Sequence, residues 1–148
     1  MSSKREYNSA LIKKRIEAVI KKAEHCDIYS MRLIARAYAD GEYFPKDCFA
    51  AEAWLRKAVE LGSVEAKKQL AKLLSEGNGI AQNFEEAFDI YHELMLDCDL
   101  DAMVDVGVAY KFGKGVPQDD AKASFYINQA IDIELDLMDS EKEKKSKT

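Results

Sequence analysis

The sequence predicts an all-α protein, an α/α solenoid of three helix-pair repeats with a capping helix before them. Three observations predict this fold. Residues 36 positions apart match in kind over three copies without a gap. Within each copy the apolar residues recur at i, i+4 and i+8, the spacing of one helix face. A short polar residue stands before each of the six helices in the three pairs, where its side chain can cap the first turn.

The repeat register is carried by columns of small and apolar residues. Because a single helix pair cannot bury its own apolar face, a fixed period of this length indicates stacked neighbouring repeats. The main columns are Ser30, Ala66 and Ala102; Ile34, Leu70 and Val106; Ala35, Ala71 and Gly107; Tyr38, Leu74 and Tyr110; Gly41, Gly77 and Gly113; Phe44, Ile80 and Val116; Ala51, Ala87 and Ala123; Trp54, Ile90 and Tyr126.

The expected helix starts repeat with the same period. Each capping side chain can accept a hydrogen bond from an unpaired amide of the first turn. Asn83 and Glu86 also resemble a capping box. The capping residues are Asp27, Ser63 and Asp99 before the first helices, and Asp47, Asn83 and Asp119 before the second helices.

The segments outside the repeats differ in composition. A charged helix near the N-terminus carries Ile12, Ile16 and Val19 on one face, as a cap for the first repeat requires. The last residues are polar with nothing to bury, which predicts disorder after a helix that ends near Met138. The expected segments are a capping helix in 1–25, repeats at about 27–62, 63–98 and 99–138 within 26–139, and a tail in 140–148.

The third copy carries a family resemblance. Residues 102–130 read A-M-V-D-V-G-V-A-Y-K-F-G-K-G-V-P-Q-D-D-A-K-A-S-F-Y-I-N-Q-A. This segment resembles the Sel-like repeat (SLR) family, whose pattern is A-x-x-x-L-G-x-x-Y-x-x-G-x-G-V, an acidic residue, then A-x-x-W/Y-x-x-x-A. The second copy departs at Ala71 and Leu74. The first copy has Tyr43 in place of the second loop glycine, which predicts a differently shaped loop.

Composition narrows the class of protein. A formal net charge of −5 argues against a general nucleic-acid binder. The sequence contains no run of 18 apolar residues, so it predicts no membrane span. Cys26, Cys48 and Cys98 are an odd set without metal-ligand spacing, so we expect reduced cysteines and a cytoplasmic protein.

The sequence offers little support for catalysis. His25 and His92 lie on different expected helices without an H-E-x-x-H motif. The Gly77–Gly79 and Gly113–Gly115 segments follow helices rather than strands, so they are helix-ending turns rather than phosphate loops. Cys48 stands in a first helical turn, but no base accompanies it. We therefore expect no enzyme, no catalytic residue, no metal ligand and no cofactor.

One set of polar and apolar residues stands out on the first helices. It lies opposite the core columns, and SLR arrays place that face on a concave groove, so the resemblance implies a partner-binding surface. The expected partner-binding residues are Tyr29, Arg32, Arg36, Lys68, Lys72, Val104, Val108 and Lys111. The alternative is an ordinary solvated face, because acidic residues stand three or four positions from Arg36, Lys68 and Lys72.

The resemblance also implies the mode of action. SLR proteins commonly act as adaptors, in bacteria and eukaryotes, so we expect a non-catalytic module that binds a protein or peptide partner, such as one with an acidic segment. An immunity protein that neutralises a bacterial toxin is a narrower alternative, and an enzyme on a helical scaffold is a third. No fourth repeat covers Ile127, Ile131, Leu135 and Met138, which predicts self-association or partner docking on the last helix.

Overall fold

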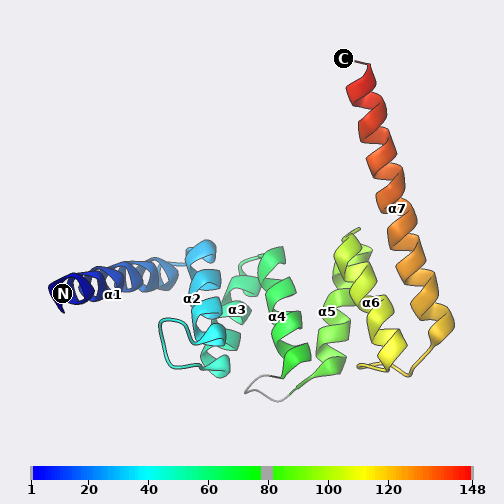
Figure 1. Ribbon diagram of the computed structural model, residues 1–148. Coiled ribbons are helices and arrows are strands. Elements are labelled where there is room, and N and C mark those ends of the chain that lie inside the picture. The colour runs from blue at the N-terminus through cyan, green and yellow to red at the C-terminus, as the bar shows by residue number, and fades with distance from the viewer. Residues whose placement is uncertain (1, 78–81, 148) are drawn as a thin grey trace. The chain divides into compact units, whose positions relative to one another are not determined.

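A computed structural model of the chain describes the backbone of residues 2–77 and 82–147 and the side chains of residues 9–77 and 82–147. The described residues form seven α-helices and no strand, which confirms the predicted all-α class (Figure 1). The predicted positions of Gly79 and Ile80 lie outside the described residues. The helices are α1 (Ser2–Glu24), α2 (Ile28–Asp40), α3 (Cys48–Glu60), α4 (Val64–Glu76), α5 (Phe84–Leu96), α6 (Leu100–Phe112) and α7 (Asp120–Ser146).

All six predicted caps are present. Each side-chain oxygen accepts a hydrogen bond from the backbone N–H three residues later, at distances from 2.8 to 3.1 Å. Hydrogen bonds from the Ser30 hydroxyl and backbone amide hold the pKa of Asp27 below its usual range. The helix starts are therefore determined locally, as the sequence predicts.

The predicted helix columns of alanine and of Ile34, Leu70 and Val106 are buried. Ala51, Ala87 and Ala123 are no more than 2% exposed, and Ile34, Leu70 and Val106 no more than 3%. The aromatic column that contains Trp54 is half-buried in each copy. The small side chains of the alanine column let neighbouring helices approach closely. The larger side chains of Ile34, Leu70 and Val106 fill the space between the helices.

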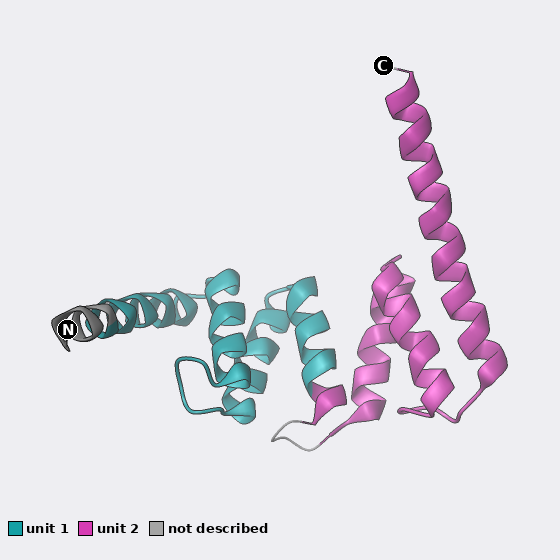
Figure 2. Cartoon of the chain, in the orientation of Figure 1, with its two compact units in different colours: residues 1–73, 78–80 teal, residues 74–77, 81–148 magenta. Residues whose placement is uncertain are grey.

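The chain divides into two compact units (Figure 2). Unit 1 contains α1, α2, α3 and α4 up to Leu73, and α2 packs against both α1 and α3. Unit 2 begins at Leu74, and its α6 packs against both α5 and α7. The core of unit 2 is built around Leu94 and Val106, with half-buried aromatic side chains against it.

The C-terminal helix differs from the prediction. It continues to Ser146, where the sequence predicts an end near Met138 and a disordered tail. No glycine or proline follows Pro117, and charged pairs such as Asp139 and Lys142, 3.3 Å apart, support the added turns. Beyond Ala130 every described side chain of α7 is exposed, so this part of the helix extends past the core of its unit (Figure 1).

Candidate functional site

The predicted basic side chains of unit 1 include a cluster that joins the first helices of neighbouring repeats. The Arg32 guanidinium on α2 donates from Nε to Oε1 of Gln69 on α4, at 3.1 Å. Glu65 lies 4.0 Å from both Arg32 and Lys68. Its carboxylate therefore stands between two of the predicted cations. The pairing of Glu65 with Lys68 is the one that the solvated-face alternative predicts, and Arg32 adds a contact between helices that the sequence did not predict.

The other predicted residues of unit 1 are more open. Tyr29 is 65% exposed, and Arg36 and Lys72 are exposed as well. Arg36 also lies at the mouth of a groove between α1 and α2. The structure thus brings Arg32 and Lys68 together around Glu65. It also places Arg36 beside a groove between α1 and α2 that the sequence did not predict.

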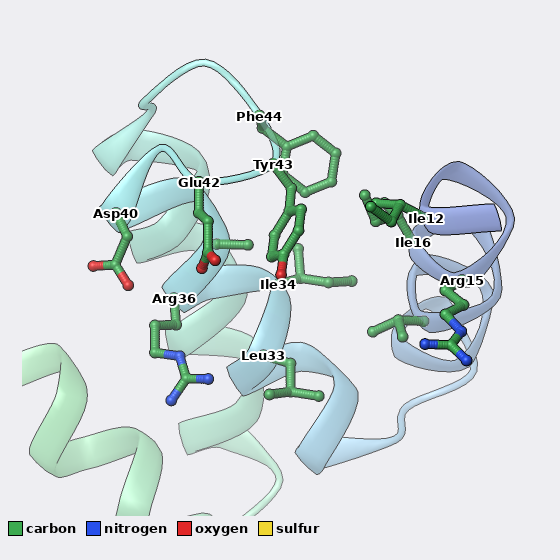
Figure 3. Close-up of a pocket in the computed structure, with 12 residues that line it drawn as sticks. Ile12, Arg15, Ile16, Leu33, Ile34, Arg36, Asp40, Glu42, Tyr43 and Phe44 are labelled. Carbon is green, nitrogen blue, oxygen red and sulfur yellow. The ribbon is translucent and has the colours of Figure 1, made fainter. Parts of the chain in front are cut away.

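This feature, here called the α1–α2 groove, is an open cavity of about 320 Å³ in unit 1 (Figure 3). Its walls come from α1, α2 and the loop between α2 and α3. Arg15 stands on the α1 side, whereas Arg36, Asp40 and Glu42 stand across the groove (Figure 3). The apolar lining consists of Ile12, Ile16, Val19, Leu33, Ile34, Ala37, Tyr43 and Phe44.

The loop that forms one wall of the groove is held by aromatic stacking. The rings of Tyr38 and Phe44 stack with centroids 4.5 Å apart. Tyr43 stands where the third copy has Gly115, whose φ is +77°, and Tyr43 itself does not adopt a positive φ. The prediction of a differently shaped first loop therefore holds, because a tyrosine in the left-handed region would be strained.

The predicted residues of unit 2 lie in different surroundings. Val104 is exposed, whereas Val108 is half-buried in the wall of a smaller cavity of about 160 Å³. Lys111 pairs with Asp120 on α7 at 3.1 Å. The predicted apolar patch is therefore reduced to Val104 and the rim of this cavity.

The smaller cavity contains two titratable groups with shifted pKa values. Burial raises the pKa of Asp105, and the carboxylates of Asp101 and Asp99 raise it further. Burial also raises the pKa of Tyr91, with a further contribution from Asp105. Burial therefore disfavours the charged form of each group relative to the same group in water.

The two cavities are related by the repeat. Ile12, Ile16 and Val19 of the α1–α2 groove lie 72 residues, or two repeat lengths, before Phe84, Phe88 and Tyr91 of the smaller cavity. Helix α1 therefore packs on α2 in the register in which α5 packs on α6. The repeat period relates these positions of α1 and α5 in the sequence, but the match is hard to recognise because α1 has aliphatic residues where α5 has aromatic ones.

The residues weighed for chemistry are separate from one another. Nδ1 of His25 lies 2.6 Å from the carbonyl oxygen of Lys21, and His92 stacks on Phe88 with ring centroids 5.9 Å apart. Cys48 is buried, while Cys26 and Cys98 are exposed. Over the described ranges, no group of three or more His, Cys, Asp or Glu side chains is arranged to hold a metal ion.

Comparison with protein-family models decides the family. The Sel1 repeat model matches residues 28–63, 64–93 and 100–132, which together make up more than half of the chain. The chain belongs to the Sel1-repeat family. The three matched segments begin at or beside the first residues of α2, α4 and α6, so each Sel1 repeat corresponds to one of the predicted helix pairs. No curated protein sequence matches the chain.

Solved structures of the same repeat type resemble this one. A Sel1 repeat protein from Oxalobacter formigenes has 26% sequence identity and a TM-score of 0.67, over 78% of this chain and 88% of that one. The protective antigen c5321 of uropathogenic Escherichia coli, described as an SLR fold, has 25% identity and the same TM-score. It covers 79% of this chain, which spans only a quarter of the antigen's length. Cysteine-rich protein B of Helicobacter pylori, at 20% identity and a TM-score of 0.55 over 83% of this chain and 88% of its own, shares the fold.

Within the described helices, none is long and apolar enough to cross a membrane.

Proposed function

We propose that this Sel1-repeat protein is a non-catalytic interaction module that binds a protein partner through its first helices α2, α4 and α6. Sel1-repeat proteins are typically protein-interaction modules. The observation that supports this surface is the Arg32–Glu65–Lys68 cluster, with exposed Arg36 and Lys72 beside it. Arginine can grip a carboxylate in bidentate fashion, so an acidic segment is the partner chemistry that fits.

In unit 2 the corresponding positions are expected to contribute apolar contact. Val104 is exposed on α6, and Val108 lies at the rim of the smaller cavity. In unit 1 Tyr29 can add an aromatic anchor, because exposed aromatic residues are enriched among the side chains that dominate binding energy. Lys111 is engaged by Asp120, so it is expected to contribute less.

The test is a charge reversal confined to α4. In Lys68→Glu/Lys72→Glu, a partner captured from the native source and quantified by mass spectrometry should be lost. The matched control is Lys46→Glu/Lys57→Glu, which makes the same change in net charge on the loop before α3 and on α3 itself. Equal capture by the wild type and the α4 variant would overturn the proposed surface.

A second candidate surface lies on α7. The side chains of Ile131, Leu135 and Met138 are about half exposed, at helical spacing, on the part of α7 beyond Ala130, where every described side chain is exposed. Exposed apolar stripes of this kind mark interfaces. We expect concentration-dependent self-association, measured by light scattering, that Ile131→Glu abolishes while Asn128→Glu does not. A strict monomer at high concentration would remove this candidate.

Two narrower proposals follow from charge and cysteines. The first is neutralisation of a basic toxin, which the net charge of −5 suits. Its test is co-expression of this protein with the toxin, which should restore growth of the host cells.

The second concerns the compartment. Three free cysteines favour a reducing compartment, so we propose a cytoplasmic protein, which fractionation of the source cells would test.

A further inference from the structure

The α1–α2 groove and the smaller cavity are counterparts in the repeat, yet their volumes differ about twofold, 320 against 160 Å³. In unit 2 the space is filled by the chain's own aromatic rings. Phe88 packs edge-on against Tyr110 at 5.6 Å between centroids, and the Lys114 ammonium lies 5.5 Å from the centre of the Phe84 ring. In unit 1 the corresponding positions hold Ile12 and Ile16, which are smaller.

The backbone widens the same difference. At Gly115 the loop of the third repeat approaches α5 so closely that a Cβ atom would lie 2.2 Å from the carbonyl oxygen of Phe84. Tyr43 holds this position in the first repeat, and its side chain excludes that approach. Its ring instead lines the groove, across from Ile12 and Ile16 (Figure 3). The α1 wall of the groove therefore lacks the aromatic side chains that α5 supplies in the counterpart, and the aromatic rings of the groove, Tyr43 and Phe44, come from the loop instead.

Three charged residues of the groove stand where the counterpart has apolar ones. Arg15 replaces the buried Ala87, Arg36 replaces Val108 and Asp40 replaces Phe112. Within the described part of the chain, none of Arg15, Arg36, Asp40 and Glu42 forms an ion pair at 4.0 Å or less. Arg15 stands on α1, across the groove from Asp40 and Glu42 (Figure 3). The α1 wall thus presents the positive charge of Arg15, whereas the facing wall carries two carboxylates, Asp40 and Glu42, together with Arg36.

We propose that the α1–α2 groove binds a short segment of a partner protein that inserts one aromatic side chain between Ile16 and Tyr43. The segment places an acidic residue beside Arg15 and a basic residue beside Asp40 and Glu42. The aromatic side chain takes the role that Phe84, Phe88 and Tyr91 play in the counterpart, and the flanking charges complement the two walls. This inference deepens the proposed function, on which it rests, by assigning a distinct site and a sequence preference.

The test is selection of displayed random peptides on the full-length protein, followed by affinity measurement on the enriched peptides. We expect an aromatic residue flanked by an acidic residue on one side and a basic residue on the other. Ile16→Phe, which copies Phe88 of the counterpart, should weaken these peptides by about tenfold or more. Ile16→Leu, which keeps the size of the side chain, should retain them. A melting curve for each variant confirms that the fold is intact.

A second variant tests the charge preference without altering the apolar walls. Arg15 is exposed, so Arg15→Glu should leave the fold unchanged and select peptides with a basic residue at the position that was acidic. Enriched peptides that lack an aromatic residue, or that bind Ile16→Phe as well as the wild type, would overturn the groove site. If those same peptides are lost in Lys68→Glu/Lys72→Glu, the proposed surface on the first helices stands and only the groove fails. No enrichment on any form of the protein would overturn both.

Discussion

The contact of α1 with α2 and the contact of α5 with α6 occupy the same place in the repeat but are packed with different residues. Helix α5 contributes Leu94 and Met95, both buried against α6. At the corresponding positions α1 has the exposed Lys22 and the buried Ala23. The α1–α2 contact therefore keeps its place in the repeat with fewer large buried side chains than the α5–α6 contact. The less tightly packed contact, that of α1 with α2, is the one beside which an open groove remains.

The largest expected difference between the two contacts lies in their stability. Leu94→Ala should lower the free energy of unfolding by about 2–5 kcal/mol, because it leaves a cavity in the core of unit 2. Ile16→Ala should cost about 1 kcal/mol, since that side chain is only half-buried. Urea denaturation of both variants makes the comparison, and equal losses would show that the α1–α2 contact is as tightly packed as its counterpart.

The loop glycine should give the next largest effect. Gly115→Ala adds a Cβ atom that clashes with the Phe84 carbonyl and places alanine at a φ of +77°, so we expect a loss of about 2–4 kcal/mol. The matched change Tyr43→Ala removes a half-exposed ring and should cost about 0.5–1 kcal/mol. Thermal melting of the pair tests this, and a neutral Gly115→Ala would mean that the loop can take the path of the first repeat.

A third pair of positions should respond in the opposite direction. Cys26 and Cys98 hold φ values of +65° and +66° at the helix ends where the second repeat has Gly62. Non-glycine residues are strained in this region, so Cys98→Gly and Cys26→Gly should each stabilise the protein by about 0.5–1 kcal/mol. Gly62→Ala should destabilise it by a similar amount. The measurement is chemical denaturation under reducing conditions, and a loss of stability in both glycine variants would contradict the strain argument.

The smallest effect concerns pH and a single side chain. Asp105 occupies the position that holds the apolar Leu33 in unit 1, and its pKa is raised by burial. The folded state therefore binds this proton more tightly than the unfolded chain does. Its stabilising contribution is present below the unfolded pKa of about 4 and is lost as the pH rises through the folded value.

Asp105→Asn should accordingly match the wild type in stability at low pH and exceed it at neutral pH. Denaturation midpoints followed from about pH 3 to pH 7 test this prediction, since the window lies just above the ordinary carboxyl pKa. Parallel curves for the two proteins would show that burial does not disfavour the Asp105 carboxylate.

Most of the fold could be predicted from the sequence because it depends on neighbours along the chain. The caps at Asp27 and Asp99 bond to amides three residues away, and the buried columns at Ala51 and Val106 recur at a fixed period. Interactions of such short range are encoded by residue type and spacing. The family follows from the same columns.

Other features depended on how side chains meet across helices. The bond from Arg32 to Gln69 and the pairing of Lys111 with Asp120 join residues whose proximity no periodic pattern indicates. The length of α7 was underestimated because disorder was inferred from the lack of apolar residues, whereas local charge pairs support the added helical turns.

What the sequence by itself determined is the period, the helix pairs, the caps and the family, since each of these repeats in one dimension. Only the tertiary structure decided that an open groove remains between α1 and α2. The volume of that groove depends on the size and direction of Ile16, Tyr43 and their neighbours together. Close packing makes such a space a property of the assembled side chains rather than of any single position.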